Sequence, residues 1–238
     1  MLDDYWEPVR ADLERLIGPL RSVPGPVSAF EVLEGTYRGA TVRALWLGRV
    51  SAPSTKGSTL HLGASLGDRP IRAYVWRRKG STIFGPTATT ADPAFDEMYI
   101  ASARPADVVS DALDADVRDM IRRRWPDTDT SLNADDGWVT IIAGRSAPGP
   151  TGTRPVPSAE QLASILDDVV LVAERLASSY DRTRRSIEAE RGAAVALEWE
   201  QSCRADLAQQ RNVGRLVAAV GLIVVAAAVA AIFFAFGR

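Results

Sequence analysis

Apolar side chains recur every three or four positions in three stretches of the chain, a spacing typical of amphipathic helices. The stretches are residues 2–21, 105–125 and 158–180, and the first defines an N-terminal helical segment, 1–22. Pro105 suits the first turn of the second helix, where its missing N–H costs no hydrogen bond. The stripes that we expect to be buried on the last two helices are Val109, Leu113, Val117, Met120 and Ile121, and Leu162, Ile165, Leu166, Val169, Ala173, Leu176 and Tyr180.

Between these helices, apolar and polar residues alternate over short stretches rich in β-branched and aromatic residues, which predicts strands. Two turn sequences, Tyr37-Arg38-Gly39 and Asp135-Asp136-Gly137, predict hairpins because Gly and Asp tolerate the left-handed backbone of a tight turn. The pattern therefore predicts an α+β fold with a mainly antiparallel sheet covered by helices, over residues 28–180. The expected strands are 30–33, 41–47, 60–64, 71–76, 95–101, 131–133 and 138–143.

After the globular domain we expect a helical stalk. The helix that leads into it should begin at Ser158, because Ser158 and Gln161 have the spacing of a capping box. Charges of both signs then replace the apolar stripe, so residues 181–215 are expected to form a solvated, juxtamembrane helix. Gly192 and Gly214 are the expected breaks in this stalk.

A run without any charge or strongly polar side chain follows, over residues 216–236. As a helix, this run would be about 31 Å long, close to the thickness of the hydrocarbon core of a bilayer. It therefore predicts one C-terminal transmembrane helix, with a buried helix or an oligomer seam as the alternative. The large apolar residues of this anchor are Leu216, Leu222, Ile223, Ile232, Phe233, Phe234 and Phe236.

The charges around the anchor predict its orientation. The first twenty residues contain acidic side chains and no continuous apolar core, so they are not expected to be a secretory signal. Arginines precede the anchor at positions 204, 211 and 215, and only Arg238 follows it. The excess of arginine on the N-terminal side favours a single-pass protein of the inner (cell) membrane with its large N-terminal domain in the cytoplasm.

Small residues in the anchor also allow a homo-oligomer. Ala227, Ala231 and Ala235 repeat at the small-xxx-small spacing that lets two membrane helices approach closely. The same spacing arises by chance in an alanine-rich helix.

Composition excludes several classes of function. Charged residues make up 24% and hydrophobic residues 46% of the chain, which is ordinary for a globular protein, and the net charge of −2 gives no field that would attract nucleic acid. Cys203 and His61 are the single cysteine and the single histidine, so one chain holds neither an internal disulfide nor a His/Cys zinc site. We expect no cofactor, and no phosphate-binding loop motif occurs in the sequence.

Two groups of carboxylates could carry chemistry. Asp92, Asp96 and Glu97 lie within six residues and could perform acid–base work or bind a cation, or else form a proline turn that leads into a strand. Acidic residues from Asp127 onward imitate a calcium-binding loop. However, Leu132 occupies the position that requires glycine, so polar turns explain them better.

Two basic clusters are candidate contacts for anionic lipid headgroups. Arg77, Arg78 and Lys79 follow a strand at an expected hairpin tip, and Arg122, Arg123 and Arg124 end a helix. Arg211 and Arg215 beside the anchor belong to the same set. The alternatives are solvated charges that complement the helix dipole and, through neighbouring tryptophans, a nucleic-acid contact that the overall charge makes the least favoured.

A short motif resembles a group of uncharacterised bacterial membrane-associated α+β domains. Asp92, Pro93, Phe95 and Asp96 form its D-P-x-F-D turn and strand, ahead of a helix that begins with proline at Pro105. The resemblance covers residues 35–176 and implies a fold and a membrane context, because the group has no known activity.

These observations predict a membrane-tethered cytoplasmic interaction module without catalytic activity. Its expected partners are the lipid bilayer and a membrane or cytoplasmic protein, because tethering raises the effective concentration of the domain near membrane-bound partners. One alternative is an enzyme acting on a lipid or small molecule through the carboxylates of residues 92–97. Another is a structural subunit of a membrane complex that assembles through the anchor.

Overall fold

The computed structural model describes residues 6–25, 29–48, 58–78, 87–124, 132–146, 156–209 and 212. The chain divides into two compact units, Met1–Ser186 and Ile187–Arg238. The first unit contains every strand among the described residues and the candidate sites. The second contains the last residues of helix α5 (Ala159–Arg191) and a further helical run over residues 193–209.

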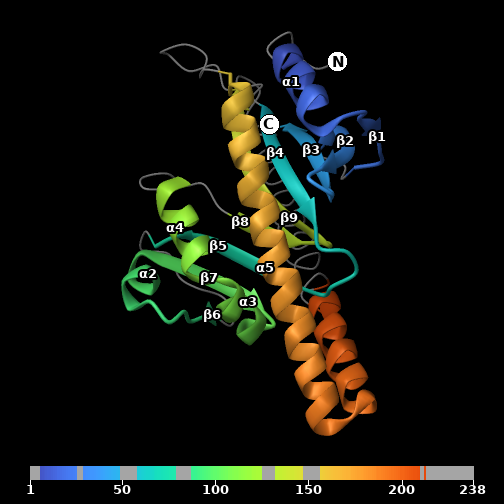
Figure 1. Ribbon diagram of the computed structural model, residues 1–238, viewed down its shortest axis with the longest axis vertical. Helices are drawn as coiled ribbons and strands as arrows, with labels where there is room; N and C mark the ends of the chain where they lie inside the picture. Colours follow the sequence, from blue (N-terminus) through green and yellow to red (C-terminus); the bar gives the residue numbers. More distant parts are fainter. Residues whose placement is uncertain are drawn as a thin grey trace, which may run out of the picture. The chain divides into compact units, whose positions relative to one another are not determined.

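The first unit is built on a nine-stranded sheet in which every described strand pair is antiparallel. This confirms the predicted α+β fold with its mainly antiparallel sheet (Figure 1). In their order across the sheet, the strands are β1 (Arg21–Ser22), β2 (Ala29–Tyr37), β3 (Ala40–Gly48), β4 (Ser58–Ser65), β9 (Trp138–Ser146), β8 (Leu132–Asp135), β5 (Arg72–Arg77), β7 (Tyr99–Arg104) and β6 (Thr87–Ala88).

Both predicted hairpins form, and their turns show why the sequence specifies them. Arg38 and Gly39 join β2 to β3 with φ angles of 48° and 84°, and Asp136 and Gly137 join β8 to β9 with 53° and 77°. Two consecutive residues at positive φ match the twist of the flanking strands, which is why short hairpins select glycine. At Gly137 a Cβ would also lie 2.7 Å from the Gly67 carbonyl oxygen, so close packing adds to the requirement.

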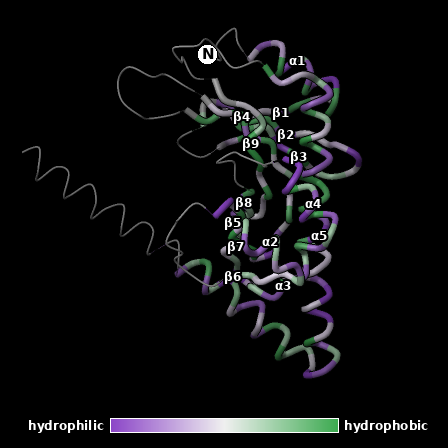
Figure 2. Tube along the Cα trace, turned by 90° about the vertical axis from the view of Figure 1, so that its left-hand side faces the viewer, coloured by the Kyte–Doolittle hydropathy of each residue, from purple (hydrophilic) through white to green (hydrophobic). Residues whose placement is uncertain are grey.

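The described helices of the first unit cover one face of this sheet (Figure 2). Side chains on that face, such as Leu62, Ala64 and Val139, are buried. Helix α1 (Glu7–Ile17) packs there, because a Cβ on Gly35 of β2 would meet the Ile17 side chain at 2.4 Å. Helix α5 lies on the same face. On the opposite face the side chains of the strands are largely half-buried and include charged and aromatic residues.

The first helix is shorter than the apolar spacing predicts. It ends at Ile17, with Gly18 at its C-cap, and Arg21 and Ser22 pair with β2 as an edge strand. The apolar residue Leu20 continues the helical spacing in the sequence but lies beyond the end of the helix. The predicted extent of 2–21 was therefore too long at its C-terminal end.

The predicted strand over 95–101 is also wrong in its first half. Helix α2 (Pro93–Met98) occupies that part, and β7 begins only at Tyr99. Asp92 caps the helix, because its carboxylate accepts a hydrogen bond from the backbone N–H of Phe95 at 3.0 Å, and proline follows it at the first helical position. The helix cap at Asp92 therefore outweighs the β-forming residues and determines the local structure.

The helix predicted over 105–125 consists of two helices, α3 (Ala106–Ala112) and α4 (Ala115–Arg124). Asp114 separates them, because its carboxylate accepts from the backbone N–H of Val117 at 3.0 Å and so begins a new helix. The predicted apolar stripe is nevertheless correct, because its residues all face the core. Its members Val109, Leu113, Val117, Met120 and Ile121 are all buried.

Helix α5 matches its prediction closely. The Ser158 N–H donates to Gln161 Oε1 at 2.9 Å and the Gln161 N–H donates to Ser158 Oγ at 3.2 Å, which is the predicted capping box. Its predicted stripe is buried from Leu162 to Tyr180. Gly192 (φ 91°) interrupts the helix as expected. Asp181 and Arg182, predicted as the start of a solvated stalk, are instead ion-paired to Arg69 and Asp111 of the globular unit.

None of the described helices combines the length and the apolar composition that a membrane span requires. The predicted anchor, 216–236, lies outside the described part of the chain. The same holds for Gly214, the basic residues Lys79, Arg211, Arg215 and Arg238, and residues 127–131 of the acidic stretch, whose remaining residues form β8.

Candidate functional site

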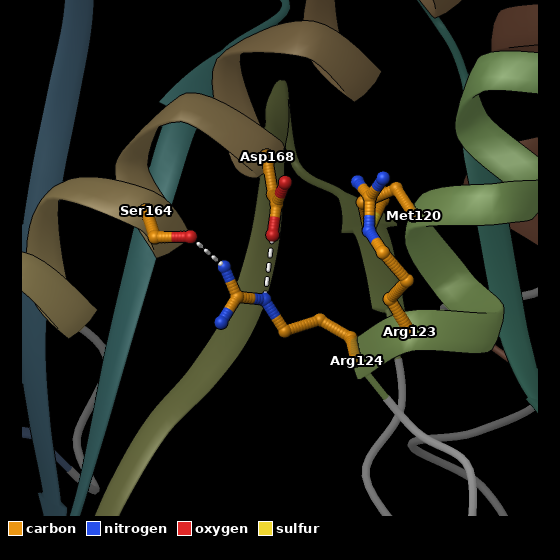
Figure 3. A pocket seen from close by; sticks show the side chains of 5 residues that line it. All are labelled: Met120, Arg123, Arg124, Ser164 and Asp168. Carbon is orange, nitrogen blue, oxygen red and sulfur yellow. Dashed lines mark hydrogen bonds and ion pairs between the residues drawn. The ribbon is translucent and has the colours of Figure 1, made fainter.

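A pocket lined by arginines lies between the end of α4 and the first half of α5 (Figure 3). Its volume is about 260 Å³. Two consecutive arginines come from the last turn of α4, and two polar residues come from α5. The lining residues are Met120, Arg123, Arg124, Ser164 and Asp168.

Local sequence explains how the two helices present these side chains. Arginines at the C-terminal turn of α4 complement the negative end of its dipole. Ser164 and Asp168 are four residues apart on α5, so they lie on one face of that helix, one turn from each other. Met120 is fully buried one turn before the arginines and forms an apolar side of the pocket.

Arg124 is fixed by two hydrogen bonds to α5. Its Nε donates to Asp168 Oδ2 at 2.5 Å and its Nη2 donates to Ser164 Oγ at 2.5 Å. A guanidinium group has five N–H donors, so the group keeps donors beyond these two bonds. Ser164 accepts through its oxygen and therefore retains its own O–H as a donor.

Arg123 differs from its neighbour. Figure 3 shows its side chain on the other side of Asp168, beside Met120. It is exposed, and it forms no ion pair with the residues that the structure describes. The pocket thus combines one arginine that is held in place with one whose guanidinium is available to solvent.

Burial raises the pKa of Asp168 above its ordinary value. The hydrogen bond from Arg124 and the positive charges of Arg124 and Arg123 oppose this shift, and the charge of Asp167 adds to it. Asp167 is itself engaged, since Tyr37 Oη donates to it at 2.9 Å and Arg38 Nη1 lies 2.9 Å away. Two arginines against one carboxylate leave the pocket with a net positive charge.

Two other arginines of the predicted lipid-contacting set, Arg122 and Arg78, are held against helix α2. Arg122 Nη2 donates to Asp92 at 2.5 Å, and its guanidinium lies 5.5 Å from the centre of the Phe95 ring. Arg78 donates to the carbonyl oxygen of Asp96 at 3.2 Å. Arg77 ends β5, which pairs with β7 and β8, so β5 forms no hairpin with β6, the next described strand.

Two of the three carboxylates around α2 hold the local structure together. Asp92 caps the helix and forms ion pairs with Arg122 and Arg118. Asp96 accepts from both the backbone N–H and the hydroxyl of Thr90, at 3.0 and 2.9 Å. Glu97 is exposed. This geometry gives Asp92 and Asp96 a role in the fold.

The pKa of Asp92 offers a direct test of this structural role. The hydrogen bond from Arg122, followed by that from the Phe95 N–H, lowers the pKa of Asp92 below its ordinary value. A carboxylate with a lowered pKa stabilises the fold above its unfolded-state pKa, about 4, and loses that contribution as the pH falls through the folded value. Asp92→Asn is therefore expected to lower stability at pH 7 and to flatten the loss of stability on acidification.

The measurement is the unfolding midpoint in urea as a function of pH, with Asp107→Asn as the matched charge control at an exposed position of α3. A catalytic acid would show the opposite titration, with a pKa shifted up towards neutrality. An NMR titration that placed the pKa of Asp92 above its ordinary value would contradict the cap assignment.

The sheet face opposite the described helices carries a second polar arrangement that the sequence did not reveal. Arg43 of β3 crosses Gly63 and places its guanidinium 4.2 Å from the centre of the Trp138 ring. Burial lowers the pKa of Arg43 to about 10, and Glu34 and Asp136 oppose that shift. The arrangement depends on which strands are neighbours, so sequence spacing alone gives no signal for it.

Ser164 and Asp168 were likewise missed. They occupy polar positions between the buried residues of the α5 stripe, where an amphipathic helix places polar side chains anyway, so the sequence gives no signal that marks them. Among the described residues there is no group of three or more residues that could hold a metal ion.

Comparisons with known proteins add a distant fold similarity. No protein-family profile matches the chain, and no curated protein matches it in sequence. The chain is similar to the crystal structure of the mycobacterial trehalose monomycolate transport factor A, TtfA, with 13% sequence identity and a TM-score of 0.45. The similarity covers 74% of this chain and 96% of that chain. It is too distant to support an argument about function.

Proposed function

We propose that this chain is a membrane-tethered interaction module without catalytic activity, with its globular unit in the cytoplasm. The observation that carries the proposal is the uncharged run over residues 216–236. Its length as a helix matches the hydrocarbon core of a bilayer. Arginines at positions 211 and 215 before the run, against Arg238 alone after it, support the orientation.

The polar groups of the globular unit support a binding role over a catalytic one. Asp92 is engaged in a helix cap, Asp96 accepts hydrogen bonds from Thr90, and Asp181 forms an ion pair with Arg69. In the described part of the chain, only two large apolar side chains are exposed, Met98 and Leu197. A partner that binds the described surface would therefore contact mainly charged and polar groups. Basic surface at the end of α4 suits a partner or lipid headgroup of negative charge.

The two alternatives fare differently. The enzyme hypothesis needs the carboxylates of residues 92–97 in a concave site, and the engagement of Asp92 in a helix cap and of Asp96 with Thr90 does not support it. The hypothesis of a structural subunit that assembles through the anchor predicts a stable oligomer of the full chain in mild detergent. A monomer under those conditions would favour the tethered module.

Cys203 gives a direct test of orientation, because it is the single thiol and precedes the anchor. In intact cells expressing the full chain, a membrane-impermeant maleimide is expected to leave Cys203 unlabelled. After permeabilisation the same reagent should label it. Labelling is read as a mass-shifted band on a gel.

A relocated cysteine provides the matched control. In a Cys203→Ser background, Arg238→Cys places the thiol after the anchor, where intact cells should be labelled. Labelling of Cys203 in intact cells would overturn the cytoplasmic assignment.

A further inference from the structure

We propose that the pocket between α4 and α5 binds a phosphate group, held by Arg123, Arg124 and Ser164. The site extends the proposed function, on which it rests for the expectation that an anionic lipid headgroup is a natural source of the phosphate. The shared chemistry is an oxyanion of tetrahedral shape with several acceptor oxygens.

The donors in the pocket match that chemistry. Arg124 is oriented by Asp168 and Ser164, at 2.5 Å each, so its remaining N–H groups have a defined direction before a ligand arrives. A guanidinium that is fixed in advance loses less conformational entropy on binding, and its planar fork suits two oxygens of one phosphate. The Ser164 hydroxyl adds a neutral donor beside it.

Arg123 supplies the second charge. Its exposed guanidinium lies on the other side of Asp168 (Figure 3) and forms no ion pair with the described residues. The Arg123 guanidinium can therefore bind an anion without first breaking an ion pair with another described residue. Arg122 on the same turn cannot do so without breaking its ion pair with Asp92.

The size and charge of the pocket favour a small anion over a larger ligand. A volume of about 260 Å³ lies below the range of about 300–1,000 Å³ that is usual for drug-sized ligands. The lining is mainly polar, with Met120 as its one apolar side chain. Asp168 acts as a positioning residue for Arg124, and the two arginines outweigh its single negative charge.

The test is calorimetric titration of the full chain in a nonionic detergent with two probes. The probes are inorganic phosphate and short-chain dihexanoyl phosphatidic acid. Dihexanoyl phosphatidylcholine controls for partition of acyl chains into the detergent, because its headgroup carries no net charge. We expect saturable binding of at least one phosphate probe.

Variants localise the binding. Arg123→Gln is expected to weaken it about tenfold, which corresponds to roughly 1.4 kcal/mol, and Ser164→Ala about threefold. Arg21→Gln removes the same charge from an exposed position on the edge strand β1, where the arginine is paired with Glu34, and should change the affinity less than twofold. Circular dichroism of each variant checks that the fold is retained.

The outcomes separate the sources of the phosphate. Tight binding of phosphatidic acid with weak binding of inorganic phosphate supports a lipid headgroup, and comparable binding of both supports a free phosphate compound. The absence of saturable binding for both probes would overturn the site, as would an equal loss for Arg21→Gln and Arg123→Gln. Because micelles replace the bilayer here, phosphate binding can succeed or fail independently of the tether.

Discussion

Deletion of residues 216–236 is expected to transfer nearly all of the chain from the membrane pellet to the supernatant. The deleted run contains the large apolar residues from Leu216 to Phe236 and no charge. A helix of this length would place its backbone polar groups in intrahelical hydrogen bonds and its side chains in lipid, and nothing else in the described chain could replace it. The measurement is immunoblotting of the two fractions after lysis and ultracentrifugation.

A charged variant distinguishes insertion of the segment into the bilayer from its nonspecific adsorption to membranes. Val224→Arg combined with Val225→Arg places two charges near the middle of the run. Each arginine at the centre of a membrane helix costs about 2.5–3.5 kcal/mol on an insertion scale, so the doubly substituted chain should lose most of its membrane fraction. Replacement of the same two valines by leucine is the matched control. A membrane fraction that all three variants retain would contradict the tether.

The second large effect is expected from Phe95→Ala, which should lower the free energy of unfolding by about 3–5 kcal/mol. Phe95 is 1% exposed and stacks on Tyr99 with ring centres 4.8 Å apart. Removal of the ring leaves a cavity beneath Arg122 and beside β7. Urea unfolding of the full chain, followed by circular dichroism, measures the loss.

Met98→Ala on the same helix is the control for this prediction. Met98 is 40% exposed, so its truncation should cost about 0.5 kcal/mol or less. Similar losses for the two variants would show that α2 does not anchor its end of the sheet. The expected contrast would instead identify Phe95 as the apolar residue through which α2 packs beneath Arg122 of α4.

The sequence predicts well those parts of the fold whose structure is determined by interactions between residues close together in the chain. The capping box at Ser158 and the turns at Gly39 and Gly137 depend on residues within four positions of one another, and each formed as predicted. The stripe of α5 is equally local, since the helical period alone defines its buried face.

Competing local signals explain the errors. Residues 95–101 contain β-forming side chains, but the cap at Asp92 and the proline after it begin a helix first. The spacing of apolar residues continues through residue 114, yet Asp114 caps a new helix there and divides the segment. In both cases one aspartate carboxylate with a backbone N–H three residues later outweighed the wider pattern.

The candidate site could be predicted only in part, because it is assembled from distant segments. The arginines at the end of α4 were evident, but their partners were not: Arg124 binds Asp168, 44 positions away, and Arg122 binds Asp92, 30 positions away. Which arginine is held and which is exposed follows from tertiary packing. Sequence spacing identified a basic cluster, and the structure reduced it to a pocket with one available guanidinium.

The tether is tested most directly by alkaline carbonate extraction of membranes that contain the unmodified full chain. Carbonate at high pH releases proteins bound at the surface by charge and leaves those with a helix in the lipid. We expect the chain to remain in the pellet after ultracentrifugation and to enter the supernatant only when detergent is added. Its release by carbonate alone would contradict a membrane-spanning anchor.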